Sequence, residues 1–168
     1  EVAAEAGERP DYVERLRVAA RLHDIGKLIV PQHVLLKQGP LTADEFELVK
    51  SHSLLGSQLL EGSPSPTVQL AGEVALTHHE RWDGTGYPSA RAGEDIPLSG
   101  RITAIADVYD SLVSARVYKP AWSPLDAIHY ISAGRGTQFD PRLVRAFIAV
   151  MVRRDPSLLS QLDRSTLV

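Results

Sequence analysis

The chain has 168 residues, of which 43% are hydrophobic and 23% charged, a composition typical of a single globular domain with a sizeable core. It contains no cysteine, which excludes disulfides and thiolate metal sites, so any metal would be held by imidazole and carboxylate groups. The net charge of −3, the lack of a long apolar run and the lack of a secretory signal argue against nucleic-acid binding and a membrane span, and predict a cytoplasmic location.

The two ends of the chain differ from its middle. Residues 1–10 are polar and contain Gly and Pro, which predicts the remnant of an upstream helix. The only methionine is Met151, so Glu1 is not a translation start, and we expect a fragment, a processed product or an excised domain. Residues 11–152 are predicted to form one domain, and residues 153–168 a polar C-terminal tail.

The first long helix is predicted over residues 11–25, where apolar residues recur at helical spacing. It would carry His23 and Asp24 in its last turn and stop at Gly26. Residues 31–40 follow as a connector, because they start with Pro31 and end with Gly39-Pro40.

A second helix is predicted from the capping-box sequence at residues 42–45 to the breaker Gly62. His52 lies at helical spacing from the apolar residues of this helix and is therefore expected to face inward. The apolar stripe consists of Phe46, Leu48, Val49, Leu55, Leu59 and Leu60.

Four further helices are predicted from apolar periodicity and from the Pro, Ser or Asp residues near their starts. A Gly- and Pro-rich loop over residues 80–99 separates two of them, and loops of this length in compact domains are usually functional or disordered. No segment alternates like a β-strand, so the predicted fold is all-α, a single-domain bundle of about six to seven helices. The four helices span roughly residues 65–79, 101–115, 123–134 and 140–152.

Six side chains are candidate metal ligands because they are imidazoles and carboxylates placed on or beside four predicted helices. Five or six nitrogen and oxygen ligands exceed the needs of one tetrahedral ion and suit two ions. Paired ions can hold the attacking and leaving oxygens of a phosphodiester. The candidates are His23, Asp24, His52, His78, His79 and Asp107.

Each candidate also has a simpler interpretation. An inward histidine such as His52 can be a hydrogen-bonded core residue, and adjacent histidines can lie at the surface. His23 with Asp24 can be a helix-terminal cation beside a solvated acid. Asp107 is the exception, because an acid among apolar neighbours needs a buried partner. The remaining histidines, His33 and His129, are assigned to the core or the surface.

Several residues near these candidates could bind an anionic substrate. Lys27 lies one helical turn after Asp24 and could neutralise a phosphate oxygen, although it would also suit a helix C-terminus. Arg116 and Lys119 could clamp a phosphate with Asp110, or lie in a solvated turn. Tyr87 could stack on a base or anchor its loop.

Two motifs resemble those of a known family. The sequence His23-Asp24-Ile25-Gly26-Lys27 is similar to the signature of the HD phosphohydrolases. The segment His78-His79-Glu80 followed by residues 83–88 (DGTGYP) resembles the additional signature of the HD-GYP subgroup. The later segments 101–110 and 139–141, with Arg116 and Lys119, also fit this subgroup, so the resemblance covers roughly residues 12–152.

The resemblance implies an all-helical bacterial phosphodiesterase that hydrolyses cyclic di-GMP to linear pGpG and often on to GMP, with two or three iron or manganese ions. The six candidates above would be the metal ligands, Asp24 would bridge the ions, and Lys27 would contact the scissile phosphate. Other substrate-binding residues implied by the resemblance are Gly84, Gly86, Tyr87, Pro88, Asp110, Arg116 and Lys119.

The family also has an upstream helix with a histidine ligand, whereas no histidine precedes His23. The chain is therefore expected to be N-terminally truncated and to follow a receiver or sensor domain. The resemblance further implies contacts between the loop at residues 84–88 and GGDEF-type cyclases. Two alternatives to this phosphodiesterase stay open. The chain could be a cyclic di-GMP receptor without catalysis, or a phosphohydrolase that acts on another cyclic dinucleotide or nucleotide.

Overall fold

The structure is a computed structural model that describes residues 1–115, 120–163 and 166. Its described part is helical and contains no named β-strand, which confirms the all-α prediction. The α-helices are α1 (Val2–Glu5), α2 (Pro10–Ala19), α3 (Gln32–Leu35), α4 (Ala43–Lys50), α5 (His52–Leu59), α6 (Pro66–Thr77), α7 (Leu98–Val113), α8 (Pro124–Ala133) and α9 (Pro141–Arg154). Four short 3-10 helices are η1 (Ala20–Leu22), η2 (Ile25–Leu28), η3 (Gly93–Asp95) and η4 (Pro156–Ser160).

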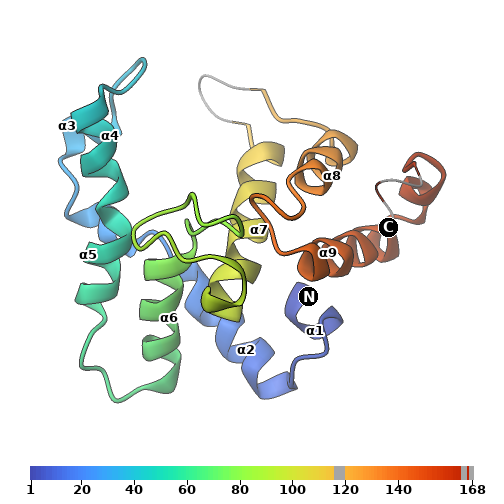
Figure 1. The fold of residues 1–168 in the computed structure, drawn as a ribbon, viewed down its shortest axis with the longest axis horizontal. Coiled ribbons are helices and arrows are strands. Elements are labelled where there is room, and N and C mark those ends of the chain that lie inside the picture. Colours follow the sequence, from blue (N-terminus) through green and yellow to red (C-terminus); the bar gives the residue numbers. More distant parts are fainter. Residues whose placement is uncertain (116–119, 164–165, 167–168) are drawn as a thin grey trace.

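Helix α6 lies at the centre of one half of the bundle, where it packs against α2, α5 and α7 (Figure 1). Helix α7 continues into the other half, where it packs against α8 and α9. The main core lies mostly between these last helices and includes the fully buried side chains of Ile105, Ile128 and Val144. This arrangement brings the C-terminal end of α6 beside the middle of α7, where the candidate ligands lie.

The predicted helix over residues 11–25 ends earlier than expected. Helix α2 stops at Ala19, and His23 and Asp24 lie between η1 and η2 instead of in a last α-helical turn. Gly26 explains the close packing of this segment, because a Cβ atom there would lie 2.0 Å from the His52 carbonyl oxygen and 2.5 Å from the Gly56 nitrogen. Gly26 is therefore required for backbone contact with α5 and does not act as a left-handed helix stop.

Two other boundaries differ from the prediction. The second predicted helix is divided into α4 and α5 at Ser51, whose hydroxyl donates to the Leu48 carbonyl and thereby competes locally with the backbone pattern. Part of the predicted connector at residues 31–40 forms the short helix α3, which starts after Pro31. These changes shorten elements but leave their order unchanged.

The two ends of the chain pack onto the same core. Helix α1 contacts α9, and Ala3 is buried in the main hydrophobic cluster. Beyond α9, Leu158 and Leu162 are buried in this cluster as well. Residues 153–163 therefore contribute apolar contacts, which their polar sequence did not indicate.

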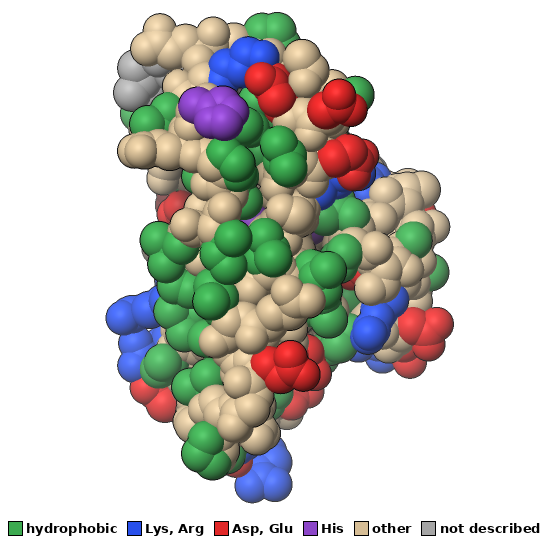
Figure 2. All heavy atoms as spheres, turned by 90° about the vertical axis from the view of Figure 1, so that its left-hand side faces the viewer, with side chains coloured by type: hydrophobic (Ala, Val, Ile, Leu, Met, Phe, Trp, Pro, Cys, Tyr) green, Lys and Arg blue, Asp and Glu red, His purple; other side chains and the backbone are tan. Residues whose placement is uncertain are grey.

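The outward face of α3, α4 and α5 exposes many apolar side chains, which Figure 2 shows as a broad hydrophobic area. Phe46, Leu48 and Leu59 are 47%, 44% and 50% exposed, so their expected place on a buried stripe is wrong. Figure 2 and the burial data show no side chain of the described chain covering this face. Within the described ranges, no helix has both the length and the apolar character that crossing a bilayer demands.

Candidate metal centre

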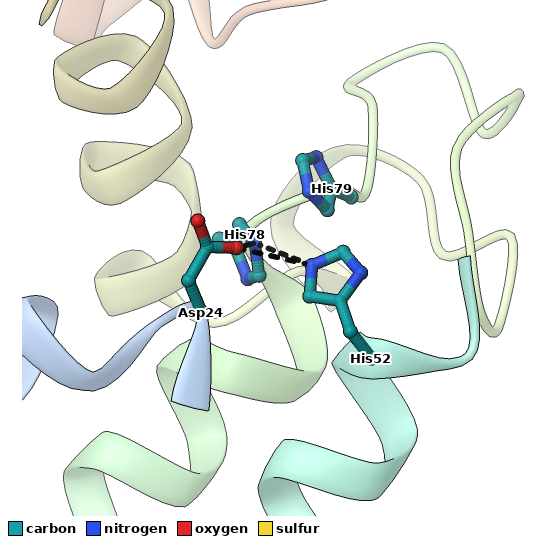
Figure 3. Close-up of side chains that lie close together, drawn as sticks. All are labelled: Asp24, His52, His78 and His79. Carbon is teal, nitrogen blue, oxygen red and sulfur yellow. Dashed lines mark hydrogen bonds and ion pairs between the residues drawn. The ribbon is translucent and has the colours of Figure 1, made fainter. Parts of the chain in front are cut away.

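Four side chains from separate parts of the chain converge on one point (Figure 3). Asp24 lies between η1 and η2, His52 begins α5, and His78 and His79 directly follow α6. One ligand-type atom of each residue lies within 4.8 Å of those of the other three. The Asp24 Oδ1 atom is 3.4 Å from His52 Nε2 and 3.9 Å from His78 Nε2, and these two nitrogens are 3.4 Å apart.

A second group surrounds the other oxygen of Asp24. The His23 Nε2 atom lies 3.4 Å from Asp24 Oδ2 and 3.5 Å from Asp107 Oδ1 of α7. The Lys27 ammonium also donates to Asp24 Oδ2, at 2.6 Å. The two oxygens of one carboxylate thus face different sets of side chains, and Asp24 links the two sets.

Backbone carbonyls hold three of the imidazoles in a defined orientation. The Nδ1 atoms of His23, His52 and His78 lie 2.8, 2.5 and 2.9 Å from the carbonyl oxygens of Ala20, Val49 and Ala75. Because a carbonyl oxygen only accepts, these Nδ1 atoms carry the proton, and a neutral ring then has its lone pair on Nε2. In all three rings Nε2 is the atom that faces Asp24.

The protonation states match this arrangement. Burial lowers the pKa of His52, and it lowers the pKa of His78 to about 4 and that of His79 to about 3. These three rings are therefore neutral near pH 7. Hydrogen bonds to Asp107 and Asp24 instead raise the pKa of His23 to about 10.

The two carboxylates remain ionised although they are partly buried. For both Asp24 and Asp107 burial raises the pKa, but this effect is outweighed. Hydrogen bonds from His23 and Lys27 lower the pKa of Asp24 well below its ordinary value. The contact with His23 lowers the pKa of Asp107. The site therefore offers negative oxygen atoms next to the neutral nitrogen atoms of His52, His78 and His79, while His23 carries a proton that a bound cation would replace.

These residues fit a divalent cation. Donor atoms bonded at about 2.1 Å to one tetrahedral ion are roughly 3.4 Å apart, close to the separations between Asp24, His52 and His78. The Asp24 Oδ1 atom is buried and makes no hydrogen bond to the described residues. A buried carboxylate oxygen needs a polar or cationic partner, and the three surrounding imidazoles make this position suitable for a metal.

The loop after α6 folds back onto the candidate ligands. The Tyr87 backbone N–H donates to the His79 carbonyl, and the Tyr87 and His79 rings lie 4.8 Å apart with a tilt of 31°. A Cβ atom on Gly86 would lie 2.3 Å from the Arg81 nitrogen and 2.6 Å from the Glu80 Cα, so this close approach requires glycine. Gly84 adopts φ +80°, in the left-handed region that glycine tolerates best.

Glu80 holds this loop in place. Its side chain is only 3% exposed, and its two carboxylate oxygens accept the backbone N–H groups of Ser89 at 2.7 Å and Arg91 at 3.1 Å. In the sequence Glu80 belongs to the motif after His79 but has no predicted role. Its position directly after two histidines at a helix end was a usable signal, because a buried acid there needs backbone donors.

A cavity of about 390 Å³ lies beside the candidate ligands. It is lined by His78, His79, Asp107 and Tyr87 and also by Phe46 and Lys50 of α4. Neither α4 residue is predicted to face a site from the sequence. Phe46 belongs to the predicted apolar stripe, and Lys50 has no predicted role.

The structure brings the six predicted ligands together in the two linked groups, with Lys27 beside them. Gly84, Gly86 and Tyr87 form the adjacent loop, where Pro88 is exposed, and Asp110 is exposed one turn after Asp107 on α7. Arg116 and Lys119 fall outside the described residues.

Several known proteins are similar to this chain in sequence. The chain is 53% identical to a cyclic di-GMP phosphodiesterase of Vibrio cholerae, over 84% of this chain and 30% of the relative. It is 42% identical to the 3′3′-cGAMP-specific phosphodiesterase 2 of the same organism, over 80% of this chain and 26% of the relative. The chain thus spans less than a third of the length of these curated relatives.

A solved structure agrees with the fold. The crystal structure of a cyclic GMP-AMP specific phosphodiesterase of V. cholerae matches with a TM-score of 0.66 and 22% identity, over 95% of this chain and 42% of the other. The family model of the HD domain matches residues 1–143, which is most of the chain and includes the six candidate ligands. The chain therefore belongs to the HD domain family.

Proposed function

We propose that this chain is a metal-dependent phosphodiesterase of the HD-GYP type that hydrolyses cyclic di-GMP. The observation that carries the proposal is the linking position of Asp24, whose two oxygens face two separate groups of ligand-type side chains. The name of the relative with 53% identity supports the substrate. Water would be added across one phosphodiester bond, which yields linear pGpG, and a second hydrolysis would yield GMP.

The side chains suggest how two ions would be held. Asp24 with His52, His78 and His79 would hold one ion, and His23, Asp24 and Asp107 would hold the other. We infer iron or manganese, because the ligands are imidazoles and carboxylates and no thiolate is available. A third ion would need ligands beyond these six.

The chain's own residues then have distinct tasks. Divalent ions bound at such a site make water a stronger acid and polarise a phosphoryl oxygen. Asp24 sets the spacing between the two ligand groups, and Lys27 places a cation 2.6 Å from Asp24 Oδ2, where it would neutralise charge on the scissile phosphate. The buried Glu80 fixes the position of the loop beside the site through its two contacts with backbone N–H groups.

The adjacent loop would bind the rest of the substrate. Tyr87 would stack on a base, while Gly84, Gly86 and Pro88 shape the entrance, and Asp110 with Arg116 and Lys119 would hold a phosphate or guanine. We further propose a cytoplasmic protein controlled by an upstream receiver or sensor domain. The exposed residues 88–90 would be available for contact with a GGDEF-type cyclase.

A second cyclic dinucleotide is the alternative substrate. The relative with 42% identity is named as specific for 3′3′-cGAMP, and its match covers most of this chain. Both substrates present a phosphodiester to the same metal centre, so the difference between them must arise from the groups that contact the bases.

The test is turnover of cyclic di-GMP and 3′3′-cGAMP by the chain with Mn²⁺, or with Fe²⁺ under anaerobic conditions. Asp24→Asn preserves the shape of the side chain but removes its charge, and should abolish both metal retention and turnover. Asp44→Asn, which changes an exposed acid in the first turn of α4, is the matched control and should remain active. Binding without turnover would identify a receptor instead, and equal turnover in Asp24→Asn would contradict the proposal.

A further inference from the structure

The cavity beside the metal centre extends to a helix that contributes no ligand. Its volume of about 390 Å³ falls within the roughly 300–1,000 Å³ of small-molecule sites. Among the described residues, one part of its lining comes from His79 and Asp107 and another from Phe46 and Lys50 of α4. A substrate whose phosphate lies at the metal centre would therefore contact α4 with another of its groups.

Lys50 is held at this cavity by two aromatic rings. Its Nζ atom lies 5.4 Å from the centre of the Phe46 ring and 5.8 Å from the centre of the Tyr87 ring, within the range of cation–π contacts. Phe46 and Lys50 are four residues apart on α4 and therefore share one face of the helix. Phe46 as a whole remains 47% exposed, which leaves surface available to a planar group.

The ammonium group of Lys50 retains donor capacity. It contacts Glu47 Oε1 at 2.7 Å, and Glu47 is an exposed residue of the same helix. An ammonium group has three N–H donors and no acceptor, so this contact leaves donors for a ligand. The other Lys or Arg side chain in the described cavity lining, Arg81, already donates to Thr85 and Asp83 within its own loop.

Aromatic rings next to a pure donor suit one purine better than the other. Guanine presents two acceptors, N7 and O6, along one edge, whereas adenine presents N7 next to an amino group that donates. A donor-only side chain gains a charge-assisted hydrogen bond with guanine and faces a competing donor with adenine. The rings themselves stack on either base and do not discriminate between them.

We propose that Lys50, flanked by Phe46 and Tyr87, binds the N7/O6 edge of a guanine and so selects guanine-containing cyclic dinucleotides. This inference rests on the proposed function, because the scissile phosphate at the metal centre is what brings a base to α4. It assigns to Lys50 a role in specificity and none in the chemical step.

The experiment compares wild type with Lys50→Met and Lys50→Arg. Equilibrium binding is measured with Mn²⁺ present, on slowly hydrolysed phosphorothioate analogues of cyclic di-GMP, 3′3′-cGAMP and cyclic di-AMP. KM and kcat are measured with Mn²⁺ on the unmodified dinucleotides. Lys50→Met should weaken the two guanine-containing ligands about 10-fold through Kd and KM, with kcat and the affinity for cyclic di-AMP unchanged. Lys50→Arg keeps the cation and should keep the preference, and Lys37→Met is the matched control because Lys37 pairs with Glu45 away from the cavity.

An analogue of cyclic di-GMP with 7-deazaguanine bases tests the contact at a single atom. It lacks the N7 acceptor, so it should bind wild type more weakly than cyclic di-GMP, while Lys50→Met should bind both equally. Equal weakening of all three cyclic dinucleotides in Lys50→Met would show a phosphate contact and overturn the inference, as would no weakening at all. Selective binding without hydrolysis would refute the proposed function and support this inference, whereas a chain that neither binds nor hydrolyses any of them would refute both.

Discussion

The substitution Gly26→Ala tests how tightly the metal centre depends on backbone packing. The new Cβ atom would lie 2.0 Å from the His52 carbonyl oxygen and 2.5 Å from the Gly56 nitrogen, both of which belong to the backbone of α5. No side chain can rotate away to relieve this overlap. The segment that carries His23 and Asp24 must therefore move away from α5.

The required displacement is large for a ligand site. A separation of even 3.0 Å needs a shift of about 1 Å. Asp24 lies on the displaced segment, and its Oδ1 atom is only 3.4 Å from His52 Nε2. A misplacement of about 1 Å can cost roughly 100-fold in rate. Overpacking costs up to about 3 kcal/mol, which corresponds to a melting temperature lower by roughly 6–12 °C for a domain of this size.

This expectation is checked on the purified chain by thermal melting, by metal content after dialysis and by turnover of cyclic di-GMP. Gly72→Ala is the matched control, because its Cβ would meet Leu60 and Ser57 at 3.7 Å, an ordinary contact, within α6. That variant should be stabilised by up to about 1 kcal/mol through helix propensity. If Gly26→Ala melts, binds metal and turns over like wild type, the close packing that we infer between η2 and α5 is wrong.

Three further substitutions follow from the same site. Glu80→Gln should lose about 2 kcal/mol of local stability, because one backbone N–H would face an amide donor. Hydrogen exchange of the Ser89 and Arg91 amides should therefore accelerate about 30-fold, while the exchange rates in α8 stay unchanged. Lys27→Met should lower kcat about 100-fold, since one cation near the phosphate is lost, yet retain metal by elemental analysis. Thr42→Ala removes the side-chain acceptor of the Glu45 N–H and should cost about 1 kcal/mol in urea unfolding, with kcat within about twofold of wild type. Equal exchange rates, metal loss in Lys27→Met, or unchanged unfolding of Thr42→Ala would contradict the respective expectation.

The sequence predicted the elements of this fold better than their ends. Helices α6, α7, α8 and α9 lie close to their expected ranges because apolar spacing and N-terminal Pro, Ser or Asp residues are local signals. The early end of α2 was not predictable locally. It depends on contact between Gly26 and α5, which are distant in sequence, and glycine serves both as a helix stop and as a point of close approach.

The candidate site shows the same division. Six residues stand out in sequence because they are imidazoles and carboxylates on or beside four predicted helices, several of them among apolar neighbours. The structure brings these six together, which are His23, Asp24, His52, His78, His79 and Asp107. The roles of Glu80 and Lys50 depend on long-range geometry. The partners of Glu80 are backbone N–H groups of the loop, which have no sequence signal, and Lys50 faces the cavity only because α4 ends beside the site.

The most direct test of the metal centre is a crystal structure of the chain grown with Mn²⁺, in which anomalous scattering locates the ions. We predict a peak bonded to Asp24 Oδ1 and to the imidazole nitrogens of His52, His78 and His79, at roughly 2.0–2.2 Å from each. A second peak is expected between Asp24 Oδ2, His23 and Asp107. Absence of any anomalous peak within reach of Asp24 at saturating Mn²⁺ would contradict the proposal that these side chains form a metal centre.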